Sequence, residues 1–157
     1  MRIQFQKKQD KPSILRCIRA DGSTTWTGLK TPFDVDHDLT HYIVESTLNF
    51  KQAFYGLLKS GIDINDWTLP KDQRPPYLKW ENLPIDAQYS EIIVGVFQRT
   101  PDENDFWESL TMQLDMYNLP PLPKLDPPVY SAILLKMNEL RNEWRNLEVN
   151  NTLEFEL

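Results

Sequence analysis

The hydrophobic pattern of this chain changes its period twice, and this limits the possible folds more than any other feature. Apolar and polar residues alternate in residues 2–7, and residues 13–20 form a second β-prone run. Alternation returns in residues 153–157, after a long middle part with apolar residues at helical spacing. We therefore expect an α+β fold in which a small antiparallel sheet packs against four or five helices.

A hairpin turn is predicted between the second and third predicted strands. Residues 20–23 read Ala-Asp-Gly-Ser, and an Asp-Gly pair favours a tight turn between antiparallel strands. Residues 24–27 are then the returning strand, so the first three strands form a meander. The terminal strand, residues 153–157, is expected to join this sheet and to bring the two ends of the chain together.

Capping residues predict where the helices begin and end. Asp34 and Asp36 are N-cap candidates for helical residues 37–60, which are bent or broken near Asn49 and stop at Gly61.

Three further helices follow in the second half of the chain. Residues 85–98 form the first, and a capping box at residues 100–103, with Pro101 as the first helical residue, starts the next. The last helix is expected from about Asp126 to about Glu148.

The segment from residue 65 to residue 84 is polar and contains four prolines. It also contains Trp67, Tyr77 and Trp80, so we expect an ordered but irregular loop that its aromatic side chains hold in place. Structureless loops of this length are uncommon in compact domains and are often functional. These three aromatic residues are therefore the predicted ligand-binding residues.

The only two histidines of the chain, His37 and His41, are four residues apart, and Glu45 follows four residues later. On a helix these positions lie close together on one side, which we place at the margin between core and solvent. Imidazole and carboxylate groups are ligands of divalent metals such as zinc. A metal-bound water there could attack an ester, an amide or a phosphoester, which suggests a hydrolase.

Three interpretations of these residues remain open. In a metal site, the acidic residues 34, 36 and 38 could orient the imidazoles, and Glu91 is a possible fourth ligand. The pattern differs from the zincin motif because Asp38 replaces the glutamate that acts as general base there. In the second interpretation, the histidines only pack and form hydrogen bonds within the fold. In the third, they bind a polar ligand or transfer protons without a metal.

The same region carries a resemblance to a known family. The chain has His-Asp-Leu-Thr-His-Tyr-Ile-Val-Glu at residues 37–45 and Phe-Tyr-Gly-Leu-Leu-Lys-Ser-Gly at residues 54–61. These residues resemble a small uncharacterised bacterial family with a His-Asp-Leu-x-His-x-x-Val-Glu stretch and an aromatic-Gly-x-Leu-x-x-Gly segment. The family has no established activity, so the resemblance implies a bacterial origin only.

Composition limits the class of protein. A length of 157 residues suits one domain, residues 1–157, and the formal net charge of −6 argues against a nucleic-acid partner. A single cysteine, Cys17, excludes an internal disulfide framework and suggests a reducing compartment. The chain has neither a signal-peptide pattern nor a membrane-spanning apolar run, so we expect a cytoplasmic protein without a membrane partner.

The last predicted helix carries a heptad-like stripe of apolar residues at alternating spacings of three and four: Tyr130, Ile133, Met137, Leu140, Trp144 and Leu147. This stripe predicts packing against the rest of the protein, with a homodimer or another protein partner as the alternative. The chain has no glycine-rich phosphate loop and no serine nucleophile elbow. The sequence thus favours a small cytosolic protein that binds a ligand or partner without catalysis, with a metal-dependent hydrolase as the alternative.

Overall fold

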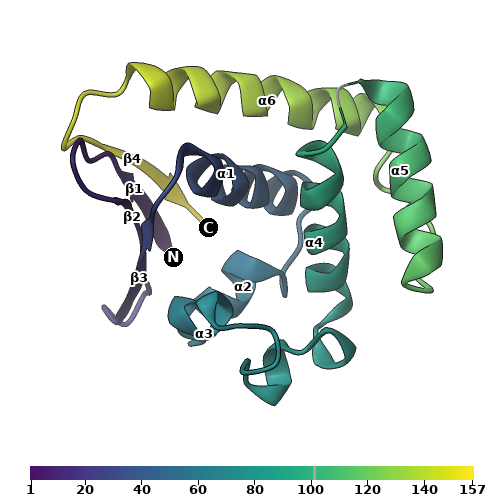
Figure 1. The fold of residues 1–157 in the computed structure, drawn as a ribbon, viewed down its shortest axis with the longest axis horizontal. Helices are drawn as coiled ribbons and strands as arrows, with labels where there is room; N and C mark the ends of the chain where they lie inside the picture. Colours follow the sequence, from purple (N-terminus) through teal and green to yellow (C-terminus); the bar gives the residue numbers. More distant parts are fainter. Residues whose placement is uncertain (101) are drawn as a thin grey trace.

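The computed structural model describes residues 1–100 and 102–157. Strands occupy both ends of the chain, and helices occupy the part between them (Figure 1). This confirms the predicted α+β class. In chain order the elements are β1 (Arg2–Gln6), β2 (Ser13–Ile18), β3 (Thr24–Leu29), α1 (Pro32–Thr47), α2 (Phe54–Lys59), α3 (Ile64–Thr68), the 3-10 helices η1 (Pro76–Leu78) and η2 (Trp80–Asn82), α4 (Ile85–Phe97), α5 (Glu103–Met116), α6 (Pro127–Asn146) and β4 (Thr152–Glu156).

The sheet has the strand order β3-β2-β1-β4, and all neighbouring strands are antiparallel. Ile3 of β1 pairs with Cys17 of β2 on one side and with Phe155 of β4 on the other. The alternate residues that face the helices are buried, as Ile3 and Phe5 illustrate. The predicted meander and the predicted addition of the terminal strand are both confirmed.

Helix α1 begins earlier than the sequence suggested. Thr31 is its N-cap and Pro32 its first residue, while the Asp34 carboxylate accepts hydrogen bonds from the backbone N–H groups of Lys30 and Thr31. The prediction of Asp34 or Asp36 as the N-cap was wrong, because Thr31 and Asp34 form a complete capping box around a proline that suits the first turn. Asp36 instead forms an ion pair with Arg141 of α6.

The break after α1 and the stop after α2 lie close to their predicted places. Asn49 has a φ of 52° just after α1, and Gly61 has a φ of 116° just after the C-cap of α2. The following loop is ordered, as predicted, but it contains α3, η1 and η2. The predicted number of helices was too low because α3 has only five residues.

Helix α5 begins at Glu103, and its N-cap is Asp102, whose carboxylate accepts a 3.0 Å hydrogen bond from the backbone N–H of Asp105. The predicted capping box at residues 100–103 was wrong. Thr100 lies just after α4, and its hydroxyl donates a hydrogen bond to the Val96 carbonyl in the last turn of that helix. The prediction for Pro101 lies outside the described residues.

Helix α1 lies between the sheet and α4, and α6 crosses above it (Figure 1). One buried cluster joins α1 to the sheet, α2 and α3, and a second joins α1 to α4, α5 and α6. Both sides of α1 are therefore covered, and its buried polar residues, Thr40, His41 and Glu45, need partners inside the protein. The α6 stripe packs inward, with Tyr130, Ile133 and Met137 buried. Within the described residues, no helix is long and apolar enough to cross a lipid bilayer.

Candidate functional site

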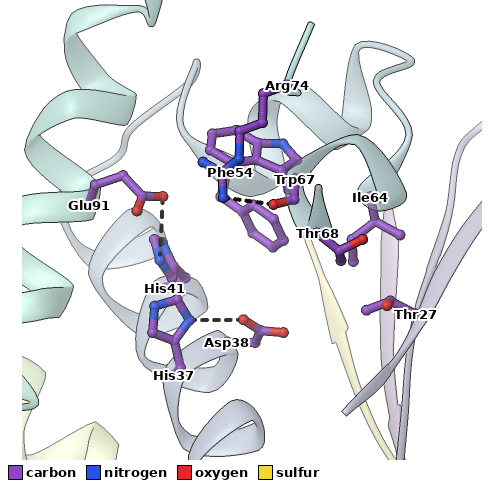
Figure 2. Close-up of a pocket in the computed structure, with 10 residues that line it drawn as sticks. All are labelled: Thr27, His37, Asp38, His41, Phe54, Ile64, Trp67, Thr68, Arg74 and Glu91. Carbon is purple, nitrogen blue, oxygen red and sulfur yellow. Dashed lines mark hydrogen bonds and ion pairs between the residues drawn. The ribbon is translucent and has the colours of Figure 1, made fainter. Parts of the chain in front are cut away.

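A cavity of about 260 Å³ lies between α1, the α2–α3 region and the middle of α4 (Figure 2). It brings together the histidine pair and one aromatic residue of the loop, Trp67, which follows His37 by 30 residues and His41 by 26 residues in the sequence. The residues that line it are Thr27, His37, Asp38, His41, Phe54, Ile64, Trp67, Thr68, Arg74 and Glu91.

His41 is one of the two most buried of these residues, and it is 1% exposed. Its Nδ1 lies 3.1 Å from Oε1 of Glu45 and 3.1 Å from Oγ of Ser90. The Ser90 hydroxyl in turn donates a 2.9 Å hydrogen bond to the same Glu45 oxygen. Since the Glu45 carboxylate only accepts hydrogen bonds, Nδ1 of His41 is the protonated nitrogen in this contact. The other ring nitrogen, Nε2, faces the cavity.

Glu45 does not line the cavity, because its carboxylate caps helix α2. Oε1 and Oε2 accept hydrogen bonds of 3.1 Å and 3.0 Å from the backbone N–H groups of Phe54 and Tyr55. The N-cap residue of α2 is Ala53, whose side chain cannot accept a hydrogen bond, so Glu45 supplies the missing cap from the neighbouring helix. The carboxylate is therefore committed to four donors inside the protein.

This arrangement bears on the predicted metal ligands His37, His41 and Glu45. Glu45 faces α2 and not the cavity. Glu91 of α4 lies beside His41 there, with its Oε1 at 3.7 Å from Nε2 of His41. Across residues 1–100 and 102–157, no group of three or more His, Cys, Asp or Glu side chains has an arrangement that could hold a metal ion. The metal set stays a prediction that would need Glu91 and a movement of side chains.

Burial disfavours a charged imidazole at His41 and is the largest single influence on its pKa. The hydrogen bond that His41 donates to Glu45 and the negative charges of Glu91, Glu45 and Asp38 together outweigh it, so the pKa of His41 is raised above the ordinary histidine value. The imidazolium form of His41 is therefore more favoured than in an ordinary histidine, and in that form Nε2 carries a proton that faces the cavity. At 3.7 Å the Glu91 carboxylate is too far away to accept a proper hydrogen bond from this group.

His37 lies nearer the solvent than His41. Its Nδ1 is 3.0 Å from Oδ1 of Asp38, and its ring centroid is 4.7 Å from that of His41. We expected both histidines at the margin between core and solvent. That holds for His37, but His41 is fully buried, because α4 covers the side of α1 on which it lies.

The three predicted ligand-binding aromatics have different positions. Trp67 lines the cavity, is 8% exposed, and has a buried Nε1–H with no hydrogen-bond partner among the described residues. Trp80 lines an adjoining cavity of about 300 Å³ that also includes Trp67, Arg74 and Glu91. Tyr77 lines neither cavity. Its ring is 48% exposed, and its hydroxyl donates to Asp66.

Sequence reasoning missed two residues that shape the cavity. Phe54 packs its ring 5.4 Å from that of His41 and 5.6 Å from that of Trp67. Arg74 lies over the Trp67 ring at 5.6 Å and donates a 2.8 Å hydrogen bond to the Trp67 carbonyl. Phe54 is the first residue of the Phe-Tyr-Gly-Leu-Leu-Lys-Ser-Gly segment at residues 54–61, which was a usable signal. Nothing in the sequence pointed to Arg74.

Ser90, His41 and Glu45 have the residue types of a catalytic triad but a different geometry. In a triad the acid holds Nδ1 of the histidine and the serine contacts Nε2. Here both contact Nδ1, and Ser90 is 0% exposed. The three side chains therefore form a buried structural network, and the only part of it that reaches the cavity is the far side of the His41 ring.

No family model matches this chain, and searches of the curated proteins and of the solved structures found no similar protein.

Proposed function

We propose that this protein binds a small molecule in the cavity between His41, Trp67 and Glu91, and that it does so without catalysis. The observation that carries the proposal is the cavity of about 260 Å³ itself, in which polar groups of His41, Glu91 and Arg74 lie beside the rings of Phe54 and Trp67. A concave site with a few convergent polar groups among aromatic side chains is the usual form of a small-molecule site.

The rigidity of the cavity wall also supports a binding site. The His41 ring is held by Glu45 and Ser90, and Glu45 also holds the start of α2, which carries Phe54. The polar and aromatic groups are thus fixed before a ligand arrives, which lowers the entropic cost of binding.

A metal-dependent hydrolase is the second candidate, and one observation favours it. The Nδ1 atoms of His37 and His41 each contact a carboxylate, that of Asp38 and that of Glu45 respectively. Carboxylates in this position orient the Nε2 atoms of metal-binding histidines. A divalent metal such as zinc would then be held by His37, His41 and Glu91. Glu45 would not bind the metal but would orient the His41 ring.

NMR spectroscopy of the indole N–H groups tests the binding proposal. Five tryptophans give five indole signals, and the signal that disappears in Trp67→Phe is that of Trp67. We expect a small-molecule fragment library to contain compounds that move the Trp67 signal and leave the signals of Trp26 and Trp144 unchanged. A library in which no compound moves the Trp67 signal would contradict the proposal.

The same spectra separate the two candidates. Zinc, manganese, nickel and iron(II) are added in turn to protein purified without a histidine tag. Under the hydrolase hypothesis, one of them binds stoichiometrically and Glu91→Ala abolishes this binding. Under the binding proposal, the metals leave the spectrum of the cavity residues unchanged.

We also propose that the protein is bacterial and acts in the cytoplasm. The resemblance of residues 37–61 supports the first statement. Burial raises the pKa of the Cys17 thiol to about 12, so this cysteine is an inert core residue of the kind common in reducing compartments.

A homodimer or protein-partner contact would use the outer side of α6, where Leu135 is 60% exposed. Small-angle scattering over a concentration series tests for the dimer.

A further inference from the structure

The two edges of the sheet are covered to different extents. At one edge, α3 lies against β3, and the Asn65 side chain donates a hydrogen bond to the Trp26 carbonyl. The backbone N–H of Ile64 also donates to the hydroxyl of Thr25. At the other edge, β4 pairs with β1 and with no further strand in the described part of the chain (Figure 1). An open edge of this kind is a template for another strand.

The pairing of β4 with β1 determines which backbone groups face the open edge. Met1 and Leu157 exchange two hydrogen bonds, and along an antiparallel ladder such pairs alternate with pairs that form none. In this register Thr152, Glu154 and Glu156 belong to the pairs without hydrogen bonds. Their N–H and C=O groups therefore point away from β1. Each of these residues offers a donor and an acceptor to a further strand.

The helix-facing side of β4 is less well covered than the same side of the other strands. Ile3 and Phe5 of β1 are fully buried there, and Leu29 of the other edge strand, β3, is also buried. Leu153 and Phe155 of β4 are only partly buried. Apolar side chains of an added strand would cover this remaining surface, and its burial would stabilise the complex.

The solvent-facing side of β4 carries the carboxylates of Glu154 and Glu156, which are both exposed. Arg2 lies 3.8 Å from Glu154, but this pair is exposed too and neutralises the charge only weakly. Residues directly opposite each other on neighbouring strands share a face, where opposite charges attract and like charges repel. In an antiparallel pair of two β4 strands in register, glutamates would face glutamates. A strand with Lys or Arg at these positions would pair favourably.

We propose that β4 binds an extended segment of a partner protein, in which Lys or Arg residues alternate with apolar residues, as a fifth strand antiparallel to β4. The basic side chains lie opposite Glu154 and Glu156, and the apolar ones cover Leu153 and Phe155. Main-chain hydrogen bonds supply the affinity, and the alternating side chains supply the specificity. None of these β4 residues lines the cavity, so the proposal is independent of the proposed ligand binding.

Three synthetic peptides of equal length test the proposal, with NMR shifts and hydrogen exchange of the backbone N–H groups as readouts. The first is Lys-Val-Lys-Ile-Lys-Val-Lys, and the second has glutamate in place of every lysine. The third is the first peptide with methyl groups on the backbone nitrogens of its lysines. We expect the first to bind and to slow exchange at Thr152, Glu154 and Glu156. The acidic peptide should bind at least about tenfold more weakly, because its charges repel those of β4. The methylated peptide should give no protection, because it cannot donate hydrogen bonds to β4.

A charge reversal locates the contact. Glu156→Lys should lower the ratio of the affinities for the basic and the acidic peptide by about tenfold, because one cross-strand charge pair changes sign. Glu148→Lys is the matched control, since it changes the net charge equally at an exposed residue that precedes β4 and should leave the ratio unchanged. Both glutamates are exposed, so neither change threatens the fold.

Each other outcome overturns the proposal. If the methylated peptide bound as tightly as the first, charge alone would explain the binding and no strand would be added. Equal effects of the two charge reversals would lead to the same conclusion. Exchange at the three N–H groups that slows with protein concentration, without any peptide, would show that a second copy of this chain occupies the edge. If the basic peptide does not bind, β4 is not a docking site for such a segment.

Discussion

The carboxylate of Glu45 accepts a 3.0 Å hydrogen bond from the backbone N–H of Tyr55, the second residue of the next helix. Through this contact the helix that carries both histidines also fixes the start of α2, whose first residue, Phe54, forms part of the cavity wall. The stability of the fold and the shape of the candidate site therefore depend on the same side chain.

We predict that Glu45→Ala destabilises the protein by about 3–5 kcal/mol, as expected when one partner of a buried polar network is removed. The variant leaves His41, Ser90 and the first N–H groups of α2 without their acceptor. Urea denaturation followed by circular dichroism measures the change. Glu81→Ala is the control, and its effect should stay within about 0.5 kcal/mol because this side chain is exposed.

A loss of less than about 1 kcal/mol in Glu45→Ala would contradict this role. It would mean that the N-terminal N–H groups of α2 find other acceptors, and that Glu45 is free to act elsewhere.

The role of Glu45 illustrates what sequence patterns reveal here and what they do not. Its spacing from His41 was visible, and so was the strand order, because alternation and turn residues are local signals. Its partners at residues 54, 55 and 90 come from two other helices. No periodicity encodes such contacts, so a structural cap resembled a third metal ligand.

Arg74 and Trp67 show the same limit on the loop. The prolines and aromatics of residues 65–84 predicted order, but not which aromatic ring would face inward. That choice depends on Phe54, against which Trp67 packs, and on Arg74, which covers the indole and binds its carbonyl. Tyr77 has a comparable side chain but finds its partner, Asp66, at the surface.

We predict that the contribution of His41 to stability decreases as the pH rises. Its pKa is raised in the folded protein, where the charges of Glu45, Glu91 and Asp38 offset the cost of burial. The imidazolium therefore stabilises the fold fully below about pH 6.5, the ordinary histidine pKa, and this stabilisation is lost as the pH passes through the folded value.

Two measurements check this prediction. An NMR titration of the ring protons should show His41 with a pKa above 6.5. Urea denaturation between pH 5 and pH 9 should show that the free energy of unfolding falls more steeply with pH in the wild type than in His41→Gln. A His41 ring that becomes charged only below pH 6.5 would show that burial dominates.

We predict that Lys7 stabilises the end of α6. Its Nζ donates hydrogen bonds to the carbonyls of Trp144, Arg145 and Leu147, at 3.0, 3.0 and 2.8 Å. These carbonyls lie at the negative end of the helix dipole, where a cation is favourable. Lys7→Met should therefore lower the free energy of unfolding by about 1 kcal/mol.

Lys8→Met is the matched control, since Nζ of Lys8 contacts only the Asn150 side chain, at 3.4 Å. Hydrogen exchange should speed up in the last turn of α6 in Lys7→Met and remain unchanged in Lys8→Met. If the two changes had equal effects, the stabilisation would come from positive charge in this region and not from hydrogen bonds of Lys7 to the end of α6.

Gly56 gives the sharpest test of how α2 is placed. A Cβ at this position would lie 2.1 Å from the backbone carbonyl oxygen of Lys51. The main chain would have to move to make room for it. We predict that Gly56→Ala costs about 3 kcal/mol or more, at the upper end of the range for overpacked positions. Because the shift must displace the start of α2, the variant should also lose the Glu45 cap and the position of Phe54.

Gly95→Ala is the matched control. Its Cβ would meet only the far end of the Arg99 side chain, at 3.0 Å, and Ala is a better helix residue than Gly by about 1 kcal/mol. We expect this variant to be as stable as the wild type or slightly more stable, with an unchanged Trp67 indole signal. If both glycine variants have the same stability, the tight approach of α2 to Lys51 is not a constraint of the fold, and the cavity wall at Phe54 must be positioned by other contacts.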